Sequence, residues 1–150
     1  MPIHRRLAAW FAGMLLLLPG TACCGGLDGT VPIFGTVDQL VEVNRQRIVG
    51  EVDPGTVGLP TSFIIDFGAN TMRGTADSLV RRLVRIQHIE NTEDKLILLG
   101  ADAGSPATEG GVGWSLAIDK SSGRAVLSAA GGDTAYVAFG RCKPAAEGDR

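Results

Sequence analysis

The chain has 150 residues, a formal net charge of −2 and three cysteines, which is enough sequence for a single domain. Its 14 basic and 16 acidic residues form no basic stripe, so the composition excludes nucleic acid as a partner. Because three is an odd number, at least one cysteine has no disulfide partner within the chain.

Residues 1–22 are predicted to be an export signal. A basic start precedes an apolar run from Leu7 to Leu18, which is followed by Pro19-Gly20 and small residues. The run is shorter than the about 20 residues that span a membrane, although a retained N-terminal anchor helix is the alternative. Cleavage after Ala22 would leave 128 residues with 12 basic and 16 acidic side chains, a formal charge of −4.

The segment Gly20-Thr21-Ala22-Cys23 resembles a lipobox, the signal at which bacterial lipoproteins are cleaved and acylated. The resemblance implies a lipid on Cys23 and an outer-membrane lipoprotein that faces the periplasm. Processing by an ordinary signal peptidase would instead leave a soluble periplasmic protein. If Cys23 is acylated, Cys24 and Cys142 remain to form a disulfide in an oxidising compartment. The alternatives are two free thiols or a bond between Cys23 and Cys142.

A single β-rich domain is expected over residues 36–143, between a tether at 23–35 and a disordered tail at 144–150. The stretch from Thr36 to Val43 also fits a capped helix. Strand is favoured because the next segment, from Arg45 to Val52, is rich in β-branched residues and Asn44 suits a turn. A further turn is predicted at Asp53-Pro54-Gly55.

The segment from Ser78 to Gly100 decides the fold class. A helix over Ser78–Gln87 would have an apolar stripe but no N-cap, and the apolar positions after Val84 leave that stripe. As a strand, the same segment ends in a turn at Asn91–Asp94, which pairs Glu90 with Lys95 and His88 with Ile97. Strand is favoured, and the helix remains the alternative.

Three antiparallel strands are predicted between Gly113 and Cys142. A loop at Lys120–Gly123, with a positive φ at Gly123, places Asp119 opposite Arg124. The register that follows pairs Ile118 with Ala125, Leu116 with Leu127 and Trp114 with Ala129. A second turn is predicted at Gly131-Gly132.

The predicted fold is mostly β: an antiparallel meander that forms a curled sheet, small barrel or sandwich. LILL (Leu96–Leu99) and AYVAF (Ala135–Phe139) are apolar on both faces, which is typical of strands covered on both sides. Whether the face carrying Trp114 closes into a dry core or opens as a pocket is the question that bears most on function. The predicted core consists of Phe63, Ile65, Phe67, Val84, Ile86, Ile97, Leu99, Trp114, Leu116, Ile118, Leu127, Val137 and Phe139.

The turn IDKSSG (Ile118–Gly123) and the strand end GRC (Gly140–Cys142) resemble segments of small, uncharacterised, exported proteins of Proteobacteria. The resemblance covers about the last half of the chain. It implies an exported, lipoprotein-like β-rich domain, and it implies no activity and no functional residue.

The sequence offers little for catalysis, and no catalytic residue, metal or cofactor is predicted. His88 is the only histidine after the export signal and shares a strand face with Glu90, which would suit base catalysis on a serine. No Gly-x-Ser-x-Gly turn accompanies it, and no metal-ligand spacing is present. Arg81, Arg82 and Arg85 form a basic cluster for which a solvated face is favoured over an anion site.

The leading hypothesis is a non-enzymatic exported envelope protein, a small lipid-anchored β domain that contacts an unknown protein or small ligand. A second hypothesis is a lysozyme-inhibitor-like periplasmic protein, although the chain has no clear counterpart of that family's inhibitory loop. A hydrolase that uses His88 is the third.

Overall fold

The computed structural model describes residues 26–46, 48–103 and 110–149, and these residues form one sheet with two 3-10 helices, η1 (Pro54–Val57) and η2 (Glu147–Asp149). The described residues contain no α-helix, as predicted, and the segment around Ser78–Gln87 becomes strand from Leu83. The nine strands are β1 (Ile33–Asn44), β2 (Ile48–Glu51), β3 (Ser62–Asp66), β4 (Thr71–Gly74), β5 (Leu83–Asn91), β6 (Lys95–Asp102), β7 (Val112–Asp119), β8 (Arg124–Gly131) and β9 (Thr134–Pro144).

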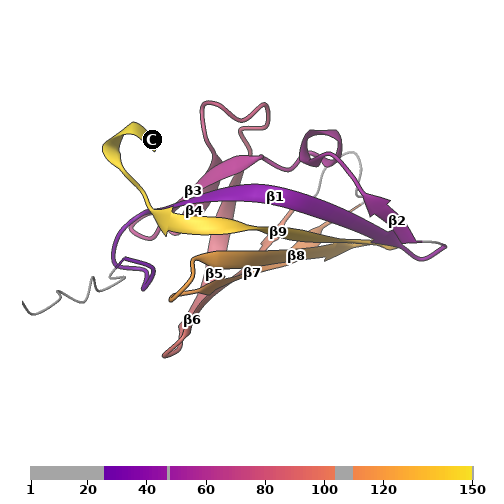
Figure 1. The fold of residues 1–150 in the computed structure, drawn as a ribbon. Helices are drawn as coiled ribbons and strands as arrows, with labels where there is room; N and C mark the ends of the chain where they lie inside the picture. The colour runs from indigo at the N-terminus through magenta and orange to yellow at the C-terminus, as the bar shows by residue number, and fades with distance from the viewer. Residues whose placement is uncertain (1–25, 47, 104–109, 150) are drawn as a thin grey trace, which may run out of the picture.

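The sheet closes into an eight-stranded antiparallel barrel because β1 pairs with β3 along one edge and with β9 along the other (Figure 1). The ninth strand, β2, is an addition to this barrel. It pairs with the second half of β1, whereas β3 pairs with the first half. Residues 52–61 leave the ladder between β2 and β3 and carry η1, which we call the η1 insert.

We call the two ends of the barrel the terminal end, where both described ends of the chain lie, and the distal end, which is opposite. The terminal end holds residues 26–32, the turns after β5 and β7 and the end of β9, while the distal end holds the η1 insert and the β4–β5 and β8–β9 loops. Figure 1 shows both described ends of the chain on the side away from β2. At the terminal end Gly26 lies against Pro144, and Leu27 is buried.

The barrel begins earlier than the predicted boundary at residue 36. Leu27 and Ile33 belong to the core, and β1 starts at Ile33, so residues 26–35 are not a simple tether. The sequence hid this because the four apolar residues of segment 25–35, which stand among glycines and one proline, show no periodicity. At the other end of the chain, Asp149 accepts a hydrogen bond from the Ala146 amide at 2.9 Å, so described residues 145–149 form a folded turn rather than the predicted disordered tail.

The β7–β8 hairpin has the predicted register. Trp114, Leu116 and Ile118 lie opposite Ala129, Leu127 and Ala125, respectively. Gly123 adopts the expected positive φ of 69° because its loop must reverse the chain in four residues. The turn at Gly131-Gly132 also forms, with Gly131 opposite Thr134.

The predicted register of the β5–β6 hairpin is wrong by two residues. Glu90 lies opposite Ile97 rather than Lys95, and His88 lies opposite Leu99. The turn is closed by Thr92, whose amide donates to the Lys95 carbonyl at 2.9 Å and whose hydroxyl accepts from the Lys95 amide at 3.0 Å. The opposite charges of Glu90 and Lys95 suggested that an ion pair closes this turn, but the hydrogen bonds of Thr92 close it instead.

Four residues of the predicted core face outward. Phe139 and Leu99 are 44% and 40% exposed, and Ile97 and Val137 are half-buried. The inward positions of the same strands are Leu96, Leu98, Tyr136 and Ala138, all of them buried. Because both faces of β6 and β9 are apolar, alternation could not tell the two faces apart. The other predicted core residues pack in or against the core: Phe63, Ile65, Phe67, Val84, Ile86, Trp114, Leu116, Ile118 and Leu127.

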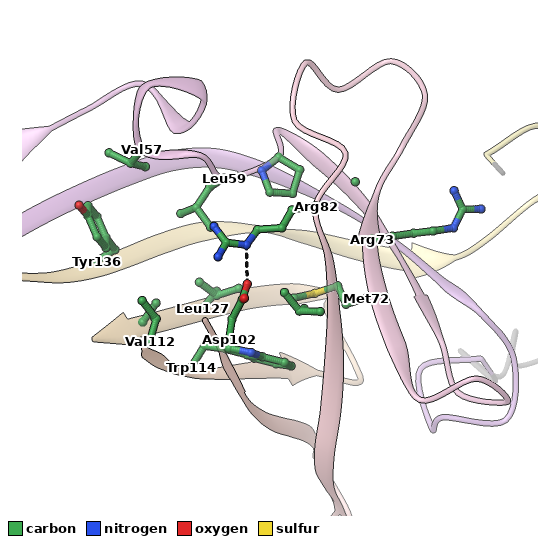
Figure 2. Close-up of a pocket in the computed structure, with 14 residues that line it drawn as sticks. Val57, Leu59, Met72, Arg73, Arg82, Asp102, Val112, Trp114, Leu127 and Tyr136 are labelled. Atoms are coloured by element: carbon green, nitrogen blue, oxygen red, sulfur yellow. Dashed lines mark hydrogen bonds and ion pairs between the residues drawn. The ribbon is translucent and has the colours of Figure 1, made fainter. Parts of the chain in front are cut away.

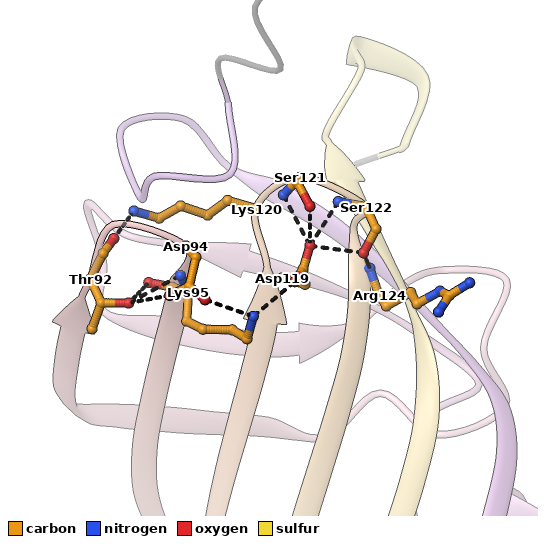
Figure 3. A network of polar contacts seen from close by, with 8 residues as sticks. All are labelled: Thr92, Asp94, Lys95, Asp119, Lys120, Ser121, Ser122 and Arg124. Carbon is orange, nitrogen blue, oxygen red and sulfur yellow. Dashed lines mark hydrogen bonds and ion pairs between the residues drawn. The ribbon is translucent and has the colours of Figure 1, made fainter.

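A polar network around Asp119 holds the terminal end (Figure 3). One carboxylate oxygen accepts from the backbone amides and hydroxyls of Ser121 and Ser122 at 2.7–3.1 Å, and the other accepts from Lys95 Nζ at 2.8 Å. These donors, Lys95 first, hold the pKa of Asp119 well below its usual range. Arg124 lies next in sequence to this turn, but its guanidinium points away, so Lys95 is the ionic partner in place of the predicted Arg124.

Candidate functional site

An apolar pocket opens at the distal end of the barrel, with a cavity volume of about 80 Å³ (Figure 2). One ordered water needs roughly 10–15 Å³ on the same scale, so the space holds a small organic molecule. The lining comes from the η1 insert and from six strands or their ends: Val57, Leu59, Pro60, Met72, Arg73, Gly74, Arg82, Val84, Asp102, Val112, Trp114, Leu127, Ala129 and Tyr136.

The η1 insert places Val57 and Leu59 over the pocket. Asp53 caps the short helix by accepting from the Gly55 amide at 2.8 Å, and Gly58 ends it with a φ of 75°. Pro at the first helical position is already restricted to a helical φ. The predicted turn at Asp53-Pro54-Gly55 is therefore the start of the element that roofs the pocket.

Hydrogen bonds fix the β4–β5 loop and thereby position Arg82. Thr75 and Ser78 are buried polar residues: the Thr75 hydroxyl shares a hydrogen bond with Ser62 at 2.6 Å, and Ser78 accepts from the Thr61 amide at 3.1 Å. The carbonyl of Arg82 accepts from the Gly74 amide at 3.0 Å. The loop is thus tied to β3 and β4, and Arg82 enters the pocket lining from a fixed backbone.

An ion pair between Arg82 and Asp102 crosses the pocket. Asp102 is an inward position at the end of β6, and the two side chains are 25% and 20% exposed. Figure 2 shows the pair between Leu59 above and Leu127 below, with Met72 and Tyr136 on opposite sides. A partly buried pair of this kind satisfies both charges, so the pocket offers no unpaired charge at this point.

Trp114 lies against Gly100, its cross-strand neighbour on β6. A Cβ atom on Gly100 would be 2.3 Å from Cζ2 of the indole, so only glycine leaves room for the ring. Trp114 is buried, and its Nε1 is enclosed with no hydrogen-bond partner among the described residues. An unpaired buried donor is uncommon in folded proteins.

Tyr136 is the second polar aromatic residue of the lining. Burial, with a smaller contribution from the carboxylate of Glu42 on β1, raises the pKa of Tyr136, so the phenol stays protonated. Its hydroxyl has no hydrogen-bond partner in the described part of the chain, and it is not among the enclosed polar atoms. The hydroxyl is therefore open to the space around it, and Figure 2 shows it turned toward Val57.

His88 and Glu90 lie outside this pocket. They face outward on β5, each with 59% of the side chain exposed, and Nε2 of His88 is 3.4 Å from Oε2 of Glu90. Within the described residues this is the only polar contact of the imidazole. The nearest outward serine in that row, Ser115, is two strands away, roughly 10 Å at the usual strand spacing. Among the residues that the structure describes, the geometry brings no serine to the histidine.

Cys142 is a free, buried thiol within the described residues, and burial raises its pKa to about 12. Its predicted partner Cys24 and the predicted lipidation site Cys23 lie outside the described residues. The disulfide and the lipid therefore stay predictions.

The predicted arginine cluster does not form one surface. Arg82 turns to Asp102, Arg81 donates to the Ala76 carbonyl at 3.2 Å, and Arg85 is exposed on β5. Sequence reasoning singled out Trp114, assigned Arg82 to a surface cluster rather than to the pocket, and missed Asp102 and Tyr136. The signal for Asp102 was present, because Leu96, Leu98, Gly100 and Asp102 alternate along one face of β6.

Fold and site define the chain as a small antiparallel barrel with an apolar pocket at its distal end. No protein-family model, curated protein or solved structure gives a significant match to it. Among the described residues, no helix is long and apolar enough to cross a membrane. The same residues contain no group of three or more His, Cys, Asp or Glu side chains placed to hold a metal ion.

Proposed function

We propose that this protein is a non-enzymatic binding protein that holds a small, mostly apolar molecule at the distal end of its barrel. The observation that carries the proposal is a pocket of about 80 Å³ enclosed by apolar side chains and crossed by one satisfied ion pair. Ligand sites in proteins are typically apolar cavities with a few placed polar groups. An eight-stranded barrel is just wide enough to be filled by side chains or to hold one small ligand.

The proposal includes export and a lipid on Cys23, which the basic start, the apolar run and the lipobox-like segment support. The first described residue, Gly26, lies against Pro144 at the terminal end, and the pocket opens at the other end. Three residues of extended chain span at most about 11 Å. An acyl group on Cys23 would therefore hold the terminal end near the membrane and leave the pocket facing away from it.

Benzene binding measured by NMR tests the pocket itself. Benzene should shift the indole N–H signal of Trp114, which is the only tryptophan after residue 22. Ala129 lines the pocket, whereas its neighbour Ala130 is exposed. Ala129→Leu should abolish the shift and Ala130→Leu should preserve it. Saturable binding that survives Ala129→Leu would place the ligand elsewhere, and no binding to the unmodified protein would refute a preformed apolar site.

Mass spectrometry of the processed protein tests the anchor. The N-terminal peptide should begin at Cys23 and carry the mass of attached acyl chains. An unmodified Cys23 on a soluble protein would contradict lipidation without affecting the proposed pocket.

A further inference from the structure

Two aromatic donors in the pocket lining have no acceptor among the described residues, and they lie at different depths. Nε1 of Trp114 is enclosed by protein atoms, whereas the hydroxyl of Tyr136 is open. The remaining lining is apolar apart from Arg73 and the Arg82–Asp102 pair, and Figure 2 shows the guanidinium of Arg73 turned away from the pocket. The open phenol of Tyr136 is thus an uncharged polar group available to a bound molecule.

We infer that the pocket takes a small, largely apolar molecule with one uncharged hydrogen-bond acceptor, such as a carbonyl or ether oxygen, which accepts from the Tyr136 hydroxyl. This inference rests on the proposed binding function and specifies the chemistry of its ligand. Tyr136 is then a specificity-determining residue. A site with an unpaired polar group discriminates against molecules that leave that group unpaired.

The acceptor is uncharged because charge has no favourable place in this pocket. Arg82 and Asp102 satisfy each other, so a charged head group would lose its hydration without gaining a free counter-ion there. An anion at Tyr136 would also lie beside Glu42, which is the cross-strand partner of Tyr136 on β1. A neutral oxygen needs only the one hydrogen bond that the phenol can donate.

The apolar part of the molecule extends away from Tyr136. Figure 2 places Met72 on the opposite side of the ion pair from Tyr136, with Leu127 and Trp114 below the pair. These side chains offer contact with alkyl or aryl groups and no further open donor. The expected orientation has the oxygen at Tyr136 and the hydrocarbon toward Met72.

A pair of isosteric probes tests the hydrogen bond. In 2-methyl-1-hexene, a methylene group replaces the oxygen of 2-hexanone, so the two molecules differ only at the acceptor. Binding of each is measured by NMR titration to the unmodified protein and to Tyr136→Phe, which keeps the ring. Loss of one hydrogen bond should weaken 2-hexanone binding roughly two- to tenfold. The affinity for the alkene should stay the same or increase, and the melting temperatures of the two proteins show that the variant folds.

Hexanoate and hexylammonium carry a negative and a positive head group, and they test whether the pocket prefers an uncharged ligand. Both should bind at least about tenfold more weakly than 2-hexanone because each must bury an unpaired charge. Tighter binding of either ion would overturn the uncharged acceptor. Equal responses of the ketone and the alkene to Tyr136→Phe would overturn the role of the phenol while leaving the pocket intact. If neither these probes nor benzene binds, the proposed function itself fails.

Discussion

Gly140→Ala should weaken the pairing of β1 with β9, which closes the barrel. Gly140 lies on β9 opposite Val37 of β1, next to the irregularity in the β1–β9 ladder between Val37 and Gln39. A Cβ atom at this position would be 1.9 Å from the carbonyl oxygen of Thr36 and 3.3 Å from the Cα of Val37. Both neighbours are backbone, so no side chain can turn aside to relieve the overlap.

The size of the effect follows from that overlap. A carbon atom and an oxygen atom that are not bonded to each other lie about 3 Å or more apart, so β1 and β9 must separate by roughly 1 Å at Gly140. Overpacking of this kind typically costs 1–3 kcal/mol. Because the strain falls on paired backbone, we expect about 3 kcal/mol, which lowers Tm by roughly 10 °C in a domain of this size.

Urea unfolding followed by circular dichroism measures the change, and Gly113→Ala is the matched control. Gly113 lies in β7, and a Cβ atom there would have no neighbour within 4 Å. The control should be neutral or stabilised by up to about 1 kcal/mol, because alanine restricts the unfolded chain. Equal stabilities of the two variants would refute the close approach of β1 and β9 at Gly140.

Three further predictions concern other parts of the molecule. Asp119→Asn should destabilise the protein most above about pH 4. Because the pKa of Asp119 is lowered and its stabilisation is lost on protonation, the stability difference between the two proteins should shrink as the pH falls below that value. Urea midpoints at pH 7 and pH 3 measure this difference, and a difference that grows in acid would contradict the prediction. Leu98→Ala should lower the free energy of unfolding by about 2–5 kcal/mol and Leu99→Ala by less than about 1 kcal/mol, because Leu98 is fully buried and Leu99 faces outward. Urea unfolding measures both, and comparable losses would refute the assignment of Leu98 to the inner face of β6 and Leu99 to the outer face. Alkylation of the exported protein under denaturing, non-reducing conditions should leave Cys24 and Cys142 unlabelled if they form the predicted disulfide, and two labelled thiols would refute it.

The parts of the fold that sequence could predict are those where turn chemistry and alternation agree. In the β7–β8 hairpin, Gly123 supplies the positive φ, and the outward residues of β8, of which only Val126 is large and apolar, alternate with Ala125, Leu127 and Ala129. Each local signal therefore indicated the same register. On β5 and β6 the signals disagreed, because Glu90 and Lys95 suggested a closing ion pair while Thr92 was able to close the turn by itself.

The site was less predictable than the fold because its residues come from distant parts of the chain. Arg82 reaches Asp102 from a loop whose course depends on buried hydrogen bonds of Thr75 and Ser78. Such contacts follow from closure of the barrel and have no short-range pattern. Tyr136 was hidden for a different reason, since β9 is apolar on both faces and its inward positions became clear only from its pairing with β1.

The pocket exists because small inward residues on β6 and β8 leave space among the large inward side chains of the distal end, such as Trp114 and Tyr136. The fully buried residues Leu96, Leu98, Leu116 and Ile118 fill the half toward the terminal end. Toward the distal end, the corresponding inward positions on β6 and β8 are Gly100 and Ala129, and the space beside Ala129 is left open.

A barrel with this distribution should gain stability when the open space is filled. Ala129→Leu adds three carbon atoms beside a cavity of about 80 Å³, and each buried methylene contributes roughly 0.8 kcal/mol. After the cost of ordering the new side chain, we expect a gain of about 1 kcal/mol in the free energy of unfolding. The same substitution should abolish benzene binding, so stability and binding would move in opposite directions, as in a protein that keeps a cavity for a ligand. A loss of stability on Ala129→Leu, with Ala130→Leu unchanged, would show that the space is too small for a side chain and hence for the proposed ligand.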